Sequence, residues 1–503
     1  MKRISRRTLL RSAAAASAAF PLFTIAGTKA SGRVIGANDL IRVGVVGIKG
    51  RGGNHISSFT SDEVKNVQLA YLIDVDSSLF DSRSKSVEDR IGSRPTCVQD
   101  VRQALDDKSL DAVSIATPNH WHSLITIWAC QAGKDVYVEK PISHNVYEGR
   151  KCVEAAKKYG RVVQHGTQSR SENRWAREIA AVQSGKYGQL LVSKGSASKP
   201  GNGRSSIGFQ PETTPPSTLD FNLWLGPAQE RPYHKNLVHY NWHWFWDFGN
   251  GEIGNQGVHQ MDIARWGIKG ATLPTRVYSV GGRFLPEGKD LPEGKDLRDG
   301  KDQAETPNMQ LGVMEFGPTT LVFEVRGLVG DKQRPEWPSD VSNAFYTTEG
   351  VIKGGKFHPK GGGAPQNLEV DDGVRVAPGG AFGSFINAMR TRKPEDCNCD
   401  AEVAHYSAAL CHLPNISYRL GTQGTYDKAR GSIGDNKEAI AVLERIRDNS
   451  KAVGVPIDKT EYTIGPMLTF DPSSEKFTGE RAEEANKLLT RPYRSPFIVP
   501  ETV

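Results

Sequence analysis

The chain has 503 residues, of which 37% are hydrophobic and 24% carry a charge. These proportions are typical of a globular protein, and the length exceeds one ordinary domain, so we expect two domains and no membrane span. The formal net charge is +7, but residues 1–30 contain six of the lysines and arginines, which leaves +1 for the rest. A charge so close to zero gives no reason to expect a nucleic-acid partner.

The first thirty residues predict an export signal. Arg6 and Arg7 precede an alanine-rich apolar run over residues 13–26, which is too short to cross a bilayer, and the segment contains no acidic residue. The small residues around Ala30 provide a cleavage site, so the mature chain would begin near Ser31. We therefore expect a twin-arginine signal peptide over residues 1–30 and a periplasmic or otherwise exported protein.

A glycine-rich turn follows the first predicted strand. Residues 40–47 form an apolar run, and the next residues are Ile-Lys-Gly-Arg-Gly-Gly before a helix-like segment. Such a turn places unpaired backbone N–H groups and a helix dipole beside a pyrophosphate. Lys49 stands where a glycine is usual, so we expect it to contact phosphate. We assign these residues of the turn to cofactor binding: Gly47, Lys49, Gly50, Arg51 and Gly52.

The second predicted strand, residues 67–73, ends in a carboxylate. Asp74 lies about as far beyond the glycines as the acidic residue that accepts hydrogen bonds from the ribose hydroxyls. A carboxylate at that position repels a 2′-phosphate. Asp74 therefore predicts NAD rather than NADP as the cofactor.

Two further strands end in groups that are suited to ligand binding. Residues 112–116 run into Thr117, and residues 136–138 run into Glu139, Lys140 and Pro141. In an open α/β sheet, ligands bind outside the carboxyl ends of the strands, so these side chains should meet a ligand. The alternation of strand, helix and turn predicts a doubly wound parallel sheet.

Taken together, the four strand ends resemble those of the Gfo/Idh/MocA oxidoreductase family. The resemblance implies an α/β protein with an N-terminal Rossmann domain that binds a dinucleotide. It also implies a C-terminal α+β domain whose open, largely antiparallel sheet supplies the substrate pocket and the contacts of a homo-oligomer. In that family the lysine of Glu-Lys-Pro touches the reacting hydroxyl and the nicotinamide ribose, and the bond before its proline is often cis. The further cofactor-binding residues are Thr117, Pro118, Asn119, His122, Glu139 and Lys140.

The predicted organisation divides the chain into four parts. After the signal peptide, we place the Rossmann domain at residues 38–168 and the substrate-binding and oligomerisation domain at 169–425. A C-terminal extension, residues 426–503, is punctuated by prolines.

The second domain contains a motif that resembles the family pattern Asp-x-Gly-x-His. Gly257 and His259 match it, but Asn255 replaces the aspartate. If the segment is one helix, Asn255, His259 and Asp262 lie on one face. Because an amide cannot take up a proton as a carboxylate can, His259 is the best candidate for the general base, with Lys140 orienting the hydroxyl or sharing the proton. The predicted catalytic residues are Lys140, His259 and Asn255, and we expect Asp262 to be structural.

An aromatic stretch shortly before this motif predicts a sugar substrate. Aromatic faces pack against the C–H face of a pyranose while neighbouring polar groups bond its hydroxyls. The four aromatics within residues 242–246 cannot all face one side, so some should enter the core. We assign Tyr240, Trp242, His243, Asn255 and His259 to the substrate. We expect no metal, because no clean ligand spacing supports one.

The function that these features predict is hydride transfer between a sugar carbon and a nicotinamide. An exported enzyme has no ready pool of free nucleotide, so we expect NAD to be held tightly. One alternative is an NAD-dependent glycoside hydrolase of the α-N-acetylgalactosaminidase type, which uses transient oxidation and elimination, with Tyr240 or His243 as the base at carbon. The other is a non-catalytic sugar-binding relative, which the presence of both Lys140 and His259 disfavours.

Overall fold

The computed structural model describes residues 39–62, 64–286, 302–329, 337–370 and 374–503. The predicted signal peptide, residues 1–30, lies outside these ranges. None of the described helices combines the length and the hydropathy that a membrane span needs.

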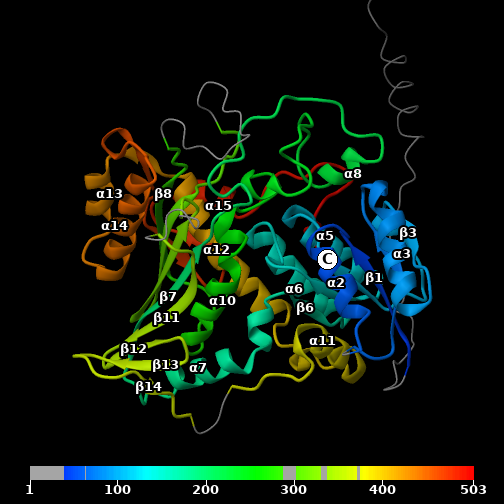
Figure 1. Cartoon of the computed structure of the whole chain (residues 1–503), viewed down its shortest axis with the longest axis horizontal. Helices are drawn as coiled ribbons and strands as arrows, with labels where there is room; N and C mark the ends of the chain where they lie inside the picture. Colours follow the sequence, from blue (N-terminus) through cyan, green and yellow to red (C-terminus); the bar gives the residue numbers. More distant parts are fainter. Residues whose placement is uncertain (1–38, 63, 287–301, 330–336, 371–373) are drawn as a thin grey trace, which may run out of the picture.

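The first domain is built on a six-stranded parallel sheet (Figure 1) with the order β3-β2-β1-β4-β5-β6. All four residues of both β4 and β5 are buried, as expected for strands that helices cover on both faces. The strand order reverses between β1 and β4, where an open α/β sheet forms its ligand crevice. The strands are β1 (Ile41–Val46), β2 (Val67–Ile73), β3 (Thr96–Val98), β4 (Ala112–Ile115), β5 (Asp135–Val138) and β6 (Val163–His165).

Helices from both halves of the chain cover this sheet. One face packs against α5 (Asn119–Gln131) and α6 (Val146–Tyr159), and the other against α2 (Arg51–Phe59) and α3 (Phe80–Ile91). Helix α11 (Gly380–Thr391) also buries Phe385 and Met389 against the second face, although in the sequence it lies among the strands of the second sheet. A shorter helix in this half is α4 (Val101–Leu105), whereas α7 (Asn173–Gln183), which follows the sheet, packs against residues of the second domain.

The second domain contains a twelve-stranded mixed sheet in which β7 and β10 form the parallel pair and the other pairings are antiparallel. Together with the parallel first sheet, it confirms the predicted fold class. Its strands are β7 (Leu190–Ser198), β8 (Arg276–Gly282), β9 (Met309–Phe316), β10 (Thr319–Arg326), β11 (Asp340–Thr347), β12 (Gly350–Lys353), β13 (Lys356–Pro359), β14 (Gln366–Asn367), β15 (Thr422–Gly424), β16 (Tyr462–Ile464), β17 (Leu468–Asp471) and β18 (Lys476–Thr478).

Helices cover the middle of this sheet on both faces. Along β10, Leu321 and Phe323 pack with α10 (Gly257–Gly267) and α12 (Ala401–Arg419), whereas Val322 between them packs with α14 (Lys437–Ala452). This alternation follows from the two-residue period of a strand. The remaining helices of this half are α8 (Phe221–Leu225), α9 (Gly251–Gly254), α13 (Tyr426–Ser432) and α15 (Ala482–Lys487).

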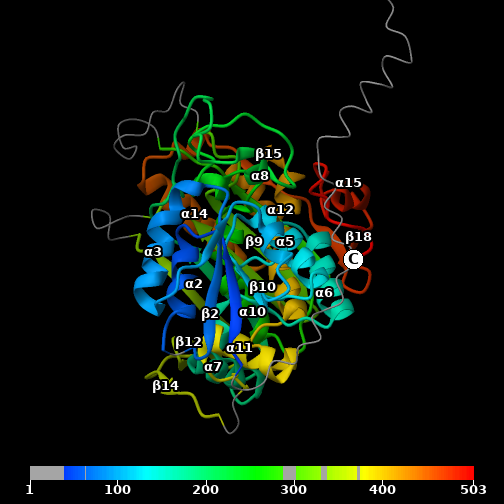
Figure 2. The same ribbon diagram turned by 90° about the vertical axis from the view of Figure 1, so that its right-hand side faces the viewer.

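The C-terminal residues return to the first domain, where Figure 2 shows the end of the chain beside α6. Arg491 pairs with Glu148 of α6, its Nε lying 3.1 Å from Oε1, and its terminal nitrogens donate to the carbonyl oxygens of His120 and Asp247. Phe497 packs edge-on against Trp121. The tail therefore ties the α5 and α6 side of the first sheet to the second domain.

Candidate active site

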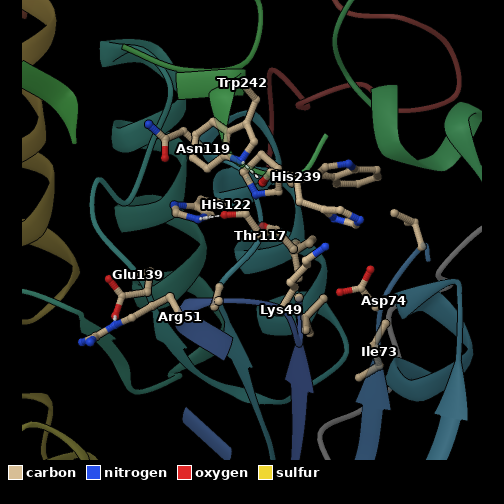
Figure 3. Close-up of a pocket in the computed structure, with 18 of the residues that line it drawn as sticks. Lys49, Arg51, Ile73, Asp74, Thr117, Asn119, His122, Glu139, His239 and Trp242 are labelled. Atoms are coloured by element: carbon tan, nitrogen blue, oxygen red, sulfur yellow. Dashed lines mark hydrogen bonds and ion pairs between the residues drawn. The ribbon is translucent and has the colours of Figure 1, made fainter. Parts of the chain in front are cut away.

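A cavity of about 710 Å³ lies at the carboxyl ends of the first sheet, between the two domains. Its floor follows the strand ends, and residues of the second domain close it from above (Figure 3). Every residue predicted for catalysis, cofactor or substrate lines this cavity except Gly52. The predicted residues that line it are Gly47, Lys49, Gly50, Arg51, Asp74, Thr117, Pro118, Asn119, His122, Glu139, Lys140, Tyr240, Trp242, His243, Asn255 and His259.

The glycine turn leaves no room for side chains where the chain folds back on itself. Gly47 has φ +80°, and a Cβ there would lie 2.7 Å from the carbonyl oxygen of Ala116. A Cβ at Gly52 would lie 1.8 Å from the carbonyl oxygen of Gly47. Gly52 is thus needed for the close contact of α2 with the turn, although it does not line the cavity.

The start of α2 is suited to an anion. The helix has no side-chain cap and no acidic residue in its first turn, so no carboxylate of its own competes with an anion there, and its first residue, Arg51, lines the cavity. Gly50, with φ +54°, lines the cavity, and a Cβ there would meet no atom within 4 Å. Lys49 adds a positive charge beside it. These features fit the pyrophosphate of a dinucleotide.

Asp74 lies at the end of β2, across from Lys49 (Figure 3). Its carboxylate accepts the N–H groups of Ile48 at 2.9 Å and Asp76 at 3.0 Å. Burial raises the pKa of Asp74 to about 6, and the two N–H groups offset part of that rise. The carboxylate is therefore oriented by the backbone, as a ligand of ribose hydroxyls needs to be.

Glu139 is a buried anchor rather than a free acid. One oxygen, Oε1, lies 2.8 Å from Arg51 Nε, 3.1 Å from His55 Nε2 and 3.1 Å from Gln168 Nε2. Burial favours the protonated form, but the hydrogen bond from His55 and the charges of Arg51 and Lys140 hold the pKa of Glu139 well below its usual range. Its side chain thus fixes Arg51 beside the cavity and supplies negative charge next to Lys140.

Lys140 connects the two domains. Its Nζ donates to the backbone oxygen of Asn255 at 3.0 Å and to the side-chain oxygen Oδ1 at 3.3 Å. Burial lowers the pKa of Lys140, and the negative charges of Glu139 and Glu252 counter that shift. The Lys140–Pro141 bond is cis, as the family resemblance implies.

His259 lines the cavity from α10, and within the described parts of the chain its ring makes no hydrogen bond. Burial and the charge of Lys140 lower the pKa of His259 to about 3, so its imidazole is neutral at physiological pH. A neutral ring can accept a proton from a bound hydroxyl.

The predicted single helical face is wrong. Asn255 follows α9 as its C-cap, with φ −92° and ψ −88°, and α10 begins only at Gly257, so Asn255 reaches the cavity from the break between two helices and His259 from the second of them. Asp262 is fully buried away from the cavity, where it pairs with Arg170 at 2.8 Å and accepts from Ser407. Asp262 is therefore structural, as the sequence predicts.

His122 holds two of the loops that form the floor. Its Nδ1 lies 2.6 Å from the carbonyl oxygen of Pro141 and its Nε2 lies 2.8 Å from that of Thr117. Asn119 donates from Nδ2 to Asn250 Oδ1 at 3.2 Å, which joins the floor to the second domain. Both side chains thus set the shape of the cavity that they line.

Aromatic residues form the wall on the side of the second domain. Trp242 and His243 stack with their ring centroids 3.6 Å apart, and His243 Nδ1 donates to the carbonyl oxygen of Tyr240 at 2.6 Å. Burial lowers the pKa of His243 to about 3, so this ring is also neutral. Trp242, Trp244 and Phe245 belong to one buried cluster, but only Trp242 of the three also lines the cavity, in agreement with the prediction that some of these aromatics enter the core.

Several cavity residues were not predicted from the sequence. Gln99 follows β3, and the rule that ligands bind at strand ends would have identified it. His239, whose Nε2 lies 3.0 Å from Asp76 Oδ2, comes from an irregular segment, and Trp224 comes from the short helix α8; no periodic pattern marks either residue. No pattern in the sequence marks Arg83 of α3 as a cavity residue either.

Two family models match the chain. Residues 41–167 match a model described as an oxidoreductase family with an NAD-binding Rossmann fold, which confirms the predicted cofactor. Residues 203–279 match the C-terminal alpha/beta domain of the same family. The cavity lies between these two matched regions.

Curated relatives match over part of their length. A glycosyl hydrolase family 109 protein of Saccharopolyspora erythraea is 29% identical over 209 residues, which are 38% of this chain and 45% of that protein. A protein of the same description from Shewanella baltica is 25% identical over 213 residues, with the same coverage. The chain thus spans less than half the length of these relatives.

Among solved structures, an NAD-binding protein from Listeria innocua has a similar fold. The TM-score is 0.51 at 15% sequence identity, and the match covers 74% of this chain and 93% of that one. At this identity the likeness concerns the fold alone.

Proposed function

We propose, from the matches of residues 41–167 and 203–279 to its family models, that the chain is a member of the Gfo/Idh/MocA oxidoreductase family. The proposed function is that of an exported NAD-dependent oxidoreductase that acts on a hydroxyl or keto group of a sugar or glycoside. One observation carries the proposal: Lys140 of the first domain and His259 of the second line the same cavity as the glycine turn.

The residues of the floor suit NAD. The N–H groups at the start of α2 and Lys49 would hold the pyrophosphate, and Asp74 would accept the ribose hydroxyls. When bound, NAD supplies a hydride acceptor or donor at C4 of its nicotinamide.

Two residues of the chain would bind the substrate hydroxyl and accept its proton. Lys140 would donate a hydrogen bond to the substrate oxygen, and the neutral ring of His259 would accept the hydroxyl proton. The charge of Lys140 disfavours protonation of His259, so the two groups would share one mobile proton. The apparent pKa values in the pH profile of turnover would therefore describe the two residues together and not either one alone.

Contacts above the floor support tight retention of the cofactor. The segment that precedes α8 reaches the first domain, where Ser77 N–H donates to Thr218 O at 2.9 Å and Asp220 N–H donates to Val75 O at 2.9 Å. His239 adds its contact with Asp76. A dinucleotide beneath this segment would leave only after these bonds open, which suits an enzyme that is exported with its cofactor already bound.

The glycosidase alternative rests on a different observation, the similarity to glycosyl hydrolase family 109 proteins. That reaction would oxidise a sugar hydroxyl, remove a proton from the carbon next to the new carbonyl, expel the aglycone, add water to the resulting unsaturated ketone and return the hydride to its carbonyl. His243 suits the second step, because its Nδ1 is engaged with Tyr240 and its neutral ring lines the cavity.

Product analysis separates the proposals. The purified protein, with its NAD content measured, is incubated with a panel of free sugars and nitrophenyl glycosides. Formation of a keto sugar with an equal amount of reduced nicotinamide supports the oxidoreductase. Released nitrophenol without net reduction of NAD supports the glycosidase. Binding without either product would contradict both and leave a sugar-binding protein.

Export is tested by fractionation. The full-length protein should appear in the periplasmic fraction of a bacterium with a twin-arginine pathway, and a variant with Arg6→Lys and Arg7→Lys should remain in the cytoplasm. Equal distribution of both proteins would contradict the proposed export.

A further inference from the structure

Glu252 lies directly behind the cavity without lining it. It is 2% exposed, on the short helix α9, and its Oε2 accepts a hydrogen bond from Asn255 Nδ2 at 3.1 Å. Its other oxygen lies 2.8 Å from Nε of Arg204, which is 5% exposed. On the far side of the amide, Asn255 Oδ1 accepts from the amine of Lys140 at 3.3 Å.

This chain of contacts fixes the direction of the Asn255 amide. An ionised carboxylate only accepts hydrogen bonds, and an ammonium group only donates them. The NH₂ group of Asn255 must therefore face Glu252 and its oxygen must face Lys140. A neutral amide in place of the Glu252 carboxylate could both donate and accept a hydrogen bond, so Asn255 could bond to it in either orientation.

We propose that Glu252 is a positioning residue for Lys140: through Asn255, it holds the amine at the place where the substrate oxygen would bind. This inference rests on the proposed hydride transfer. It also accounts for Asn255, which stands in place of the aspartate of the family motif. The missing carboxylate is supplied by Glu252, three residues earlier, which lies behind Asn255 and does not line the cavity.

The charge of Glu252 also acts on the amine. It favours the protonated form of Lys140, while burial opposes that form. The other charged or titratable groups that interact with this amine come from several elements packed around it: Glu139, Arg51, Lys199, His122, His165, His243, His259 and Cys411. Removal of the negative charge of Glu252 should therefore move the titration of Lys140 to lower pH.

The test compares Glu252→Gln with Glu178→Gln, a second buried glutamate that lies outside the cavity and accepts a backbone N–H from Gly355. Glu252→Gln should lower kcat roughly 10- to 100-fold, with little change in KM or NAD content, since the amine is misplaced rather than removed. Glu178→Gln should leave kcat unchanged. In an Asn255→Ala background, Glu252→Gln should lower kcat much less than it does in the native protein, because only the direct effect of its charge on the amine remains to be lost.

A second readout does not depend on turnover. The rate at which an amine-reactive reagent labels Lys140 is measured against pH by peptide mass spectrometry, in native protein and in both glutamine variants. The labelling curve of Glu252→Gln should shift to lower pH, and that of Glu178→Gln should match the native curve. An unshifted curve would overturn the inference even if the enzyme turns over sugars. A shifted curve without any sugar turnover would contradict the proposed function alone.

Discussion

Lys140 is a cation at the end of a buried strand, and the groups that hold it come from both domains. Glu139 supplies negative charge from its own strand end, and both oxygens of Asn255 accept hydrogen bonds from its amine. An amine in this setting can orient a hydroxyl and exchange a proton with His259, whose ring is neutral.

Replacement of Lys140 by methionine should abolish turnover without emptying the cofactor site. Loss of a group that positions or transfers a proton lowers kcat by roughly 1,000-fold. NAD content should persist, because the turn before α2 and Asp74 remain. Lys428→Met, on the remote helix α13, serves as the control and should keep native kcat.

Retention of full activity by Lys140→Met would remove this residue from the mechanism. Loss of NAD together with activity would assign Lys140 to cofactor binding instead.

Asp74 should make NAD affinity dependent on pH. Its pKa is raised to about 6, so the carboxylate is charged above that pH and becomes protonated as the pH falls through it. A protonated carboxyl accepts hydrogen bonds from ribose hydroxyls less well, so NAD affinity should fall below about pH 6. Calorimetric titration of NAD into cofactor-free protein measures this, and Asp74→Asn should bind weakly with no change across the same range.

The residues that sequence reasoning placed at the site share one feature: each follows a strand of the first sheet or belongs to the stretch from Tyr240 to His259. Strand ends are predictable because an apolar run marks the strand and the next residue must meet the ligand. His239 and Trp224 were missed because only the tertiary path of the chain brings them to the cavity. Glu252 was missed because it acts through Asn255.

At the scale of single elements, α2 and the turn before it depend on two glycines. Gly52→Ala should destabilise the protein and prevent NAD binding, because its Cβ would lie 1.8 Å from the carbonyl oxygen of Gly47. The adjacent Gly53→Ala is the matched control: its Cβ would meet only the flexible side chain of Arg83, at 3.3 Å, and alanine favours a helix. Thermal unfolding and NAD content measure both effects.

Equal NAD content in the two variants would show that the close contact at Gly52 is not needed for the cofactor site.

The helix that bears His259 shows where element prediction fails. Asn255, His259 and Asp262 have the spacing of one helical face, but the chain breaks between α9 and α10. The spacing alone carries no information on that break, because the contacts of Asn255 with Lys140 and Glu252 are formed only in the folded protein. Likewise, nothing in the sequence of α11 marks it as a cover for the first sheet.

At the scale of the whole molecule, α14 bears on the predicted homo-oligomer. It covers β9 and β10 on the face opposite α10 and α12, so this part of the sheet is occupied by the chain itself. Exposed apolar residues on the sheet lie instead on β7 and β11, at Leu191 and Val341. These two residues lie near opposite ends of the paired strands, because Val341 is opposite Ala197, so they form no shared patch, and a homo-oligomer formed through the sheet stays a prediction.

Buried neutral histidines should make the whole fold sensitive to acid. His120, His165 and His412 are at most 3% exposed, and burial lowers their pKa values to about 3 or 4. Between those values and the unfolded pKa of about 6.5, the unfolded chain binds more protons than the folded one. Stability should therefore rise with pH across this window, and each histidine should contribute about 1.4 kcal/mol per pH unit well below 6.5.

Urea unfolding of the cofactor-free protein at a series of pH values measures this dependence. The midpoint should fall steadily as the pH drops below about 6.5. A midpoint that stays constant from neutral pH down to pH 5 or so would contradict the burial of these rings in the uncharged form.

The proposed function requires Lys140 and His259, from separate domains, to face one nicotinamide ring. A crystal structure of the protein with NAD bound would show whether they do. The pyrophosphate should lie at the start of α2, the adenosine ribose at Asp74 and the nicotinamide between Lys140 and His259. A nicotinamide ring that lies away from both side chains, or a dinucleotide that binds outside this cavity, would contradict it.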